Sequence, residues 1–262
     1  MCPRILVPVQ PANRSTAITP AFILLTMGCE SIRLITFDCY GTLINWEAGM
    51  LHSLRNFFSR DGRKISDQEL LELYGEAEAE LESGSYLPYR QVLSETVQEV
   101  GRRLGVTISS EDGANFAESL REWEPFPDTV AALQALARRF RLGIISNVDD
   151  DLFAATQKKL QAPFALIVTA QQVRSYKPSL RNFQEALRRS GLRNEEVLHA
   201  GQSVYHDIVP ASFLGIANVW VNRPSRRPGA GATRAAAAQP TVEVRDLAGL
   251  AKLLLEGEHR QL

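Results

Sequence analysis

The second half of the chain alternates short apolar runs with helical patterns, and this alternation restricts the fold more than any other feature. Four apolar runs are typical of strands, each ended by a turn or polar residue: RLGIISN, FALIVTA, EVLHAGQ and ANVWVNR. The segments between them repeat apolar residues about every 3.6 positions, as amphipathic helices do. Repeated strand–helix–strand order predicts right-handed crossovers and a mostly parallel sheet, hence an α/β fold.

A further apolar run near the N-terminus, LITF, leads directly into Asp38. Gly41 allows the backbone to turn sharply after it. A carboxylate at the end of a buried strand costs free energy relative to one in water, so Asp38 either caps the turn or does chemistry. In open α/β sheets the reactive groups collect beyond the carboxyl ends of the strands, which makes Asp38 a candidate.

Residues 46–123 follow a different pattern, with three helical stretches and no strand candidate. They predict an all-helical cap domain inserted into an α/β core built from residues 30–45 and 124–262. Residues 1–29 are broken by prolines and are predicted to form a disordered extension.

Two local predictions concern polar residues in and after the helical segment. Asp128 is expected to N-cap the helix that follows it. The acidic run EAEAELE, residues 76–82, is expected to form a solvated helix face.

Composition excludes several functional classes. With 262 residues and 45% hydrophobic content, the chain can bury a full core. The net charge of −1 does not indicate a nucleic-acid partner, and no apolar segment approaches the ~20 residues that span a bilayer. Three cysteines without a pairing pattern favour a reducing compartment, so we expect a cytoplasmic protein. Cys39, beside Asp38, is interpreted as a small buried thiol.

Polar side chains cluster at the predicted strand ends and in one loop. Singly, each has an ordinary structural explanation such as helix capping. Their order along successive strands of one sheet predicts a shared site. The residues are Asp38 and Thr42 after the first strand, Ser146 and Asn147 after the second, Lys177 in RSYKP, and Gln202, Ser203, His206 and Asp207 in GQSVYHD.

This combination of motifs resembles the haloacid dehalogenase superfamily over about residues 32–255: DxYGTL, then SN, then YKP, then an aspartate five residues past the fourth strand. Tyr40 and the helical insertion are most similar to the type II 2-haloacid dehalogenase branch. The resemblance implies a Rossmann-like parallel core with a cap, a small-molecule substrate and a covalent aspartyl intermediate. Members of the family are often dimers, so the resemblance is compatible with a homodimer.

The chemistry of the matching residues agrees with that resemblance. A carboxylate with a pKa near 4 is ionised at neutral pH and can attack carbon or phosphorus. Asp38 is therefore the expected nucleophile, and Lys177 the cation that keeps Asp38 ionised. Asp207 is expected to anchor Lys177 or to position the hydrolytic water, and Ser146 to donate a hydrogen bond during catalysis. The expected substrate-binding residues are Tyr40, Thr42, Asn147, Gln202, Ser203 and Arg90.

Two positions favour dehalogenation over phosphate hydrolysis. Phosphatases of the superfamily carry a second aspartate two residues after the nucleophile, where this chain has Tyr40, a poor acid at neutral pH. Gln202 occupies the first acidic position of their GDSxxxD pattern, and an amide is a weaker Mg²⁺ ligand than a carboxylate. Halide needs no proton on leaving, and the type II branch needs no cofactor. Asp38 and Asp207 would be the metal ligands if the phosphatase alternative holds.

The match to the dehalogenase branch has gaps in the substrate pocket. The cap arginine of that branch falls on Gly75, a later tyrosine on Phe183, and an asparagine of the fourth motif on Val204. Arg90 could replace the missing cation, or could be a solvated surface arginine. His206 is either a base that handles water or a packing histidine.

Three functions therefore stay open from the sequence. The first is hydrolytic dehalogenation of a short 2-haloacid, without a cofactor. The second is Mg²⁺-dependent hydrolysis of a small activated phosphate. The third is a non-catalytic binding protein that keeps the fold, because fold alone does not determine function.

Overall fold

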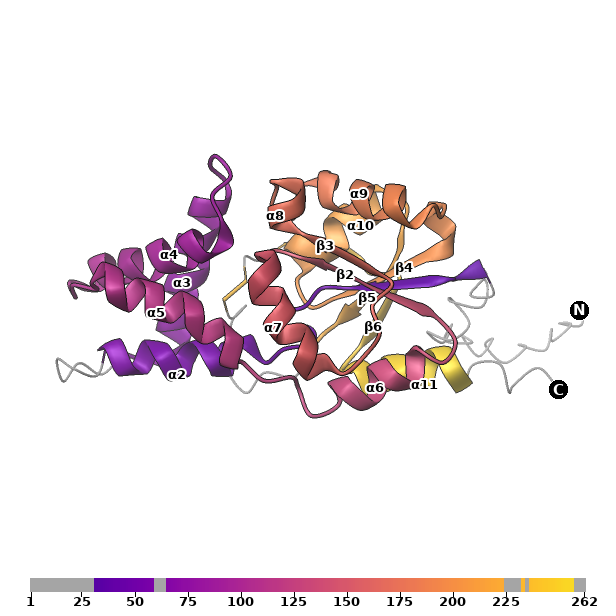
Figure 1. Ribbon diagram of the computed structural model, residues 1–262, viewed down its shortest axis with the longest axis horizontal. Helices are drawn as coiled ribbons and strands as arrows, with labels where there is room; N and C mark the ends of the chain where they lie inside the picture. The colour runs from indigo at the N-terminus through magenta and orange to yellow at the C-terminus, as the bar shows by residue number, and fades with distance from the viewer. Residues whose placement is uncertain (1–30, 59–64, 224–231, 234–235, 257–262) are drawn as a thin grey trace, which may run out of the picture.

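The computed structural model describes residues 31–58, 65–223, 232–233 and 236–256, so the predicted N-terminal extension lies outside the described residues. A six-stranded parallel sheet forms its centre, with the order β3-β2-β1-β4-β5-β6 (Figure 1). The predicted α/β fold with a Rossmann-like core is confirmed. The strands are β1 (Leu34–Phe37), β2 (Arg141–Ser146), β3 (Leu166–Thr169), β4 (Val197–Gly201), β5 (Ala217–Val221) and β6 (Val242–Val244).

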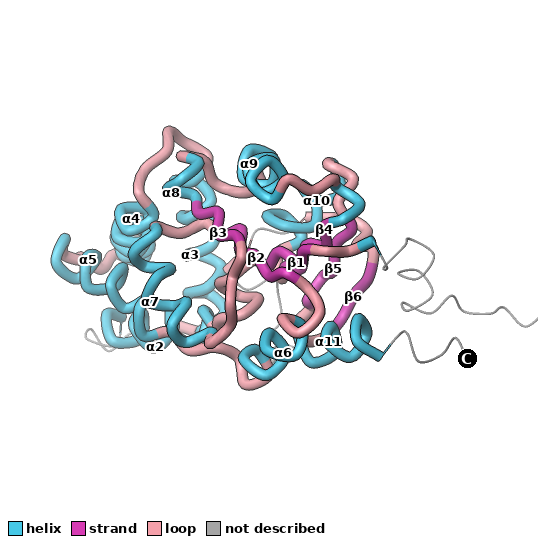
Figure 2. Tube along the Cα trace, turned by 45° about the vertical axis from the view of Figure 1, so that its right-hand side comes forward, coloured by secondary structure: helices cyan, strands magenta, loops and turns pink. Residues whose placement is uncertain are grey.

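Helices cover both faces of this sheet (Figures 1 and 2). All residues of β1 and all but the first of β2 are buried, as expected for parallel strands that are covered on both sides. One face carries α8 (Ala170–Val173), α9 (Leu180–Ser190) and α10 (Val209–Phe213). The other carries α6 (Thr129–Leu136), α7 (Asp150–Leu160) and α11 (Leu247–Glu256).

The strand order reverses direction at β1, and this reversal positions the site. Phe37 pairs with Ile144 of β2 on one side and with Ala200 of β4 on the other. The carboxyl ends of the three strands therefore meet at one edge of the sheet. Ligands of open α/β sheets bind in the crevice outside such a point.

The helical insertion, our name for residues 46–123, lies beyond that edge in Figure 1. Its described residues contain no strand. Ser66 caps α3 by accepting from the amide of Glu69, and Ser109 forms a capping box with Asp112 at α5. The elements are α2 (Trp46–Phe58), α3 (Asp67–Glu82), α4 (Tyr89–Leu104), α5 (Ser110–Ser119) and the 3₁₀ helix η2 (Leu120–Glu122).

Asp128 stands at the expected N-cap position of α6, but its side chain does not cap that helix. One carboxylate oxygen instead binds Arg223 at 2.6 Å, and the other accepts from the amide of Leu247, at the start of α11, at 2.7 Å. The prediction that Asp128 caps α6 is therefore wrong. The carboxylate stabilises the start of a helix that is distant in sequence, because α6 and α11 pack side by side.

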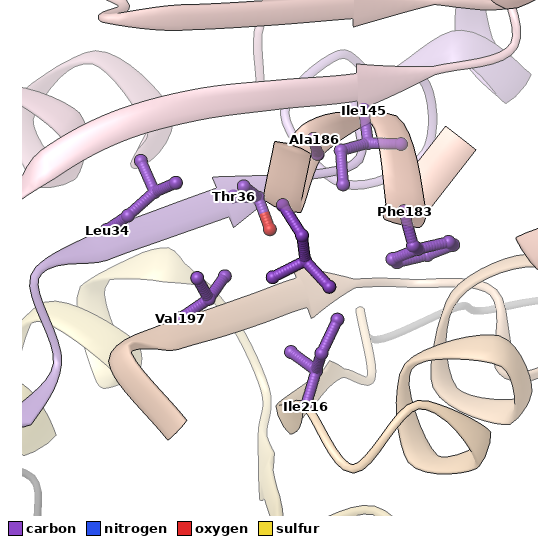
Figure 3. Close-up of a pocket in the computed structure, with 8 residues that line it drawn as sticks. Leu34, Thr36, Ile145, Phe183, Ala186, Val197 and Ile216 are labelled. Atoms are coloured by element: carbon purple, nitrogen blue, oxygen red, sulfur yellow. The ribbon is translucent and has the colours of Figure 1, made fainter. Parts of the chain in front are cut away.

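A narrow apolar space lies between the sheet and α9 (Figure 3). Leu34, Ile145, Phe183 and Val197 are among the residues that line it, and it has no room for a water molecule. The ring of Phe183 meets that of His199 edge-on, with centroids 4.8 Å apart. Phe183 therefore packs the core here.

Candidate active site

Asp38 directly follows β1 and is 8% exposed. Its amide donates to the carbonyl of Ala200, so the neighbouring strand β4 sets its position. The hydroxyl of Thr42 donates to its Oδ2 at 2.7 Å. Gly41, with φ of 96°, makes the turn that brings Thr42 back to the carboxylate, a conformation that favours glycine.

Lys177 joins this carboxylate to a second one. Its Nζ donates to Oδ1 of Asp38 at 2.8 Å, to Oδ1 of Asp207 at 2.7 Å and to the carbonyl of Ile145 at 2.9 Å. These bonds use all three protons of the ammonium group. The side chains of Lys177 and Asp207 are 2% and 0% exposed, so the three charges form a buried cluster, which we call the lysine cluster.

The charges of the lysine cluster shift one another's pKa values. Burial by itself lowers the pKa of Lys177, but the carboxylates of Asp207 and Asp38 outweigh burial and raise that pKa. Burial raises the pKa of Asp38, against the opposing charge of Lys177. The pKa of Asp207 is lowered because Lys177 and His199 outweigh its burial. The ammonium thus stays charged between an ionised Asp207 and a carboxylate of raised basicity, Asp38.

His199 was missed by the sequence reasoning. Its Nε2 lies 3.3 Å from Oδ1 of Asp207, and its Nδ1 lies 2.9 Å from the hydroxyl of Thr36. Because an ionised carboxylate only accepts, Nε2 donates to Asp207, and the hydroxyl of Thr36 also donates to the carbonyl of Leu198 at 3.4 Å. A histidine inside a predicted buried strand was the available signal, since buried polar groups need partners.

Asn147 contacts both the backbone of Lys177 and the helical insertion. Its Oδ1 accepts from the amide of Lys177 at 2.7 Å, and its Nδ2 donates to the carbonyl of Lys177 at 3.2 Å. Nδ2 also lies 3.2 Å from Oε1 of Glu82. Asn147 therefore holds the loop that carries Lys177, and its binding of substrate stays a prediction. Ser146 differs, because its buried Oγ has no hydrogen-bond partner among the described residues.

The side chain of Tyr40 points to α7, where its hydroxyl lies 2.9 Å from Oγ1 of Thr156. Burial raises the pKa of Tyr40 well above its ordinary value, so this phenol keeps its proton. Cys39 is fully buried, as predicted, and burial raises its thiol pKa. The backbone amide of Gln202 donates to the hydroxyl of Thr42 at 2.8 Å, which ties the fourth motif to the first.

Ser203 and Arg90 have structural partners. The Oγ of Ser203 accepts from the amide of His206 at the start of η4 (Val204–Ile208), a short π-helical turn. Burial lowers the pKa of His206 to about 4, so its ring is neutral at pH 7. The guanidinium of Arg90 binds Glu118 and Asp151 and is 40% exposed. The structure therefore does not bring Arg90 into the lysine cluster.

The acidic run in α3 divides between two environments, which corrects the prediction of a solvated face. Glu76 and Glu80 are each 68% exposed and pair with Arg103. Glu78 is buried and accepts from two tyrosine hydroxyls. Glu82, whose side chain is 8% exposed, accepts from Asn147. Two carboxyl groups of the helical insertion thus lie inside the molecule.

The donor set around Asp38 does not fit Mg²⁺. Both Oδ1 atoms of Asp38 and Asp207 face the ammonium of Lys177, and their Oδ2 atoms lie against Thr42 and the amide of Ser203. Gln202 contributes a neutral amide where Mg²⁺ favours an anionic oxygen. Within the described ranges, no group of three acidic, histidine or cysteine side chains is arranged to hold a metal ion.

Comparison with known families decides the classification. Residues 35–221 match the family described as haloacid dehalogenase-like hydrolase. The chain belongs to this family. The superfamily and hydrolase predictions are thereby confirmed. None of the described helices is long and apolar enough to cross a membrane.

Three similar proteins illustrate the range of the family. An (S)-2-haloacid dehalogenase of Pseudomonas putida is 26% identical over 234 residues, covering 86% of this chain and 98% of that protein. The structure of the L-2-haloacid dehalogenase of Xanthobacter autotrophicus with covalently bound chloropropionic acid superposes with a TM-score of 0.72. It has 20% identity and covers 85% of this chain and 98% of that one. A glyceraldehyde 3-phosphate phosphatase of Methanothermobacter thermautotrophicus is 34% identical over 107 residues, 37% of this chain and 45% of that protein.

Proposed function

We propose that this hydrolase uses Asp38 as a nucleophile, forms a covalent aspartyl ester and removes halide from a short 2-haloacid. The observation that carries this proposal is the lysine cluster, in which one buried ammonium group binds both Asp38 and Asp207. It supplies the positive charge that the site needs without a metal ion. Halide leaves without a proton, so the reaction does not require an acid at Tyr40.

The first step is an in-line displacement. An oxygen of Asp38 attacks the carbon that bears the halogen, the new C–O bond forms, and the halide departs with the electron pair of the broken bond. Thr42 and Lys177 orient the attacking carboxylate through their hydrogen bonds. The unpartnered hydroxyl of Ser146 is available to donate to the substrate carboxylate.

The second step hydrolyses the ester. Water attacks the carbonyl carbon of the Asp38 ester, the bond to the alkoxy oxygen breaks, and the 2-hydroxy acid leaves with one proton of the water. The other proton is released to solvent, and the carboxylate of Asp38 is restored. Lys177, held by Asp207, stabilises the negative charge that develops on the carbonyl oxygen.

Hydrolysis of a small activated phosphate is the second candidate. The partial match to a glyceraldehyde 3-phosphate phosphatase favours it, and Ser146 with Lys177 would also suit phosphate oxygens. The bond between Tyr40 and Thr156, and the donor set that does not fit Mg²⁺, favour dehalogenation. A homodimer in the cytoplasm stays a prediction.

Product release from defined substrates tests the proposal. The protein is incubated with each enantiomer of 2-chloropropionate, and separately with acetyl phosphate and p-nitrophenyl phosphate, with Mg²⁺ or with EDTA. We expect chloride release that EDTA does not change. Phosphate release that EDTA abolishes, without chloride release, would establish the phosphatase instead. No release from any of these substrates would favour the binding protein.

A further inference from the structure

The four glutamates of the acidic run in α3 differ in solvent exposure. Glu76 and Glu80 lie four residues apart on the exposed side and share Arg103, at 3.3 and 2.8 Å. Glu78 and Glu82 lie four residues apart on the buried side. The ion pairs of α3 therefore lie where water already stabilises the charge, and not where a carboxylate needs one.

Among the described residues, no lysine or arginine forms an ion pair with either buried glutamate, and Lys177 acts on Glu82 only as a nearby charge. Glu78 accepts from the hydroxyls of Tyr74 at 3.2 Å and Tyr89 at 2.9 Å, which are neutral donors. Glu82 accepts from the amide of Asn147, and its Oε2 lies 3.8 Å from the neutral ring of His206. Burial followed by the charge of Glu78 raises the pKa of Glu82. A cation that approached Glu82 would reverse this shift and gain a strong charge-assisted bond.

Glu82 lies beside the groups that surround Asp38. The amide of Asn147 that binds Glu82 also binds the carbonyl of Lys177, whose ammonium contacts Asp38. Ser146, which precedes Asn147 in the chain, has a buried hydroxyl without a hydrogen-bond partner in the described part of the structure. The side facing the core is thus suited to an anion, with the hydroxyl of Ser146 as a donor and the charge of Lys177 nearby. The side facing the insertion is suited to a donor or a cation.

Gly75, on the same helix as Glu82, packs against the backbone of Ala232. A Cβ atom on Gly75 would lie 2.7 Å from the carbonyl oxygen of Ala232, so even alanine would displace the backbone there. The position at which the type II branch carries an arginine is therefore closed to any larger residue. The acceptor that α3 places beside Asn147 is Glu82, one turn beyond Glu78.

We propose that Glu82 determines substrate specificity by binding an ammonium group, so that the substrate is a short acid with an amino substituent next to the reacting carbon. This inference rests on the proposed function, since it takes the space around Asp38 as the substrate site. The carboxylate of such a zwitterion faces Ser146 and Lys177, and its ammonium faces Glu82.

Binding of the hydrolysis products tests this specificity without requiring turnover. Isothermal titration calorimetry measures the dissociation constants of two acids. One is lactate, the product from 2-chloropropionate, and the other is isoserine (3-amino-2-hydroxypropionate), its counterpart with an ammonium group. The wild type, Glu82→Gln and Glu76→Gln are compared. Glu76→Gln is the matched control, because it makes the same change on the exposed side of the same helix.

We expect isoserine to bind the wild type about tenfold or more tightly than lactate, as one charge-assisted bond in a buried site would give. Glu82→Gln should reduce this ratio to about one, and Glu76→Gln should keep it. Equal binding of the two acids by the wild type, binding of neither, or a preference that survives in Glu82→Gln would overturn the proposal. Equal binding by the wild type overturns the proposal whether or not the variant folds.

Chloride release separates this inference from the proposed function. If 3-amino-2-chloropropionate and 2-chloropropionate both release no chloride while isoserine still binds in preference to lactate, dehalogenation is wrong and the role of Glu82 stands. If both release chloride with equal kcat/KM and the products bind equally, dehalogenation stands and the role of Glu82 is wrong.

Discussion

The lysine cluster and the surface ion pairs of Arg90 each join one cation to two carboxylates at similar distances, yet they serve the protein differently. Lys177 lies 2.8 and 2.7 Å from its two carboxylates, and Arg90 lies 2.7 and 2.8 Å from Glu118 and Asp151. The side chain of Lys177 is 2% exposed, whereas those of Arg90 and Asp151 are 40% and 54% exposed.

Burial makes the difference between these two regions. Water screens the surface pairs, so removing one charge leaves its partners solvated at little cost. In the lysine cluster, the loss of one partner leaves a charge in a medium that cannot solvate it. Distance alone therefore does not rank ion pairs, and the following substitutions measure how far the two regions differ.

The largest expected effect is on turnover. Asp38→Asn removes the attacking oxygen, so we expect chloride release to fall by at least about 10³-fold. Asp151→Asn changes the surface network, by which we mean the ion pairs of Asp151 with Arg90 and Arg121. It should leave the rate of chloride release within about twofold. Mass spectrometry of the Asp38→Asn protein checks that the amide has not deamidated. Wild-type turnover with the amide intact would refute the nucleophile.

Breaking the lysine cluster should also cost stability. Lys177→Met keeps most of the side-chain volume but leaves Asp38 and Asp207 together without a cation. We expect a loss of about 3–5 kcal/mol in the free energy of unfolding, measured by urea denaturation at pH 7. A loss below about 1 kcal/mol would place the cluster in the same class as the surface pairs.

A third measurement concerns pH and the buried carboxyl group of Glu78. Burial raises its pKa from 4.5 to about 7, so the folded protein favours the protonated form. The stability that this group contributes is present below about pH 4.5 and is lost as pH rises to 7, by about 3 kcal/mol at most. The free energy of unfolding is measured by urea denaturation at pH 5 and pH 8. Relative to the wild type, Glu78→Gln should be more stable at pH 8 than at pH 5.

Glu76→Gln is the control for that pH measurement, because Glu76 lies on the exposed side of the same helix. Its difference from the wild type should be the same at both pH values. If Glu78→Gln behaves like this control, Glu78 titrates as a solvated carboxyl group.

The smallest effect belongs to the surface network. Asp151→Asn removes the shared partner of Arg90 and Arg121, whose side chains are 40% and 34% exposed. We expect at most about 1 kcal/mol of destabilisation by urea denaturation, reduced further by added salt. A cost comparable to that of Lys177→Met would remove the distinction between the two regions.

Local pattern and strand topology together were sufficient to predict which motifs meet. Asp38, Ser146 and Asp207 follow strands whose apolar runs are evident in the sequence, and parallel strands bring their carboxyl ends to one edge. The position of Lys177 in the same site was predicted from the motif RSYKP, which contains it. The partners of these residues were harder to predict, because a hydrogen bond depends on a few tenths of an ångström.

Two contacts were not predicted for that reason. Asn147, whose predicted role is to bind substrate, holds the backbone of Lys177, 30 residues away. Asp128 was expected to cap α6 and instead caps α11, 119 residues away. Short polar side chains bind whichever backbone group the fold brings nearest, and sequence neighbours are only one source of such groups.

The amino-acid sequence by itself determined the alternation of strands and helices, the edge of the sheet at which chemistry is possible, and the carboxylate there. It also determined that Glu76 and Glu80 lie on one face of α3 and that Glu78 and Glu82 lie on another, since residues four apart share a face. Only the tertiary structure decided which of those faces is buried. That choice depends on the packing of α3 against α4 and the core, which no local pattern contains, and it sets whether a glutamate is a solvated charge or a buried acceptor beside the site.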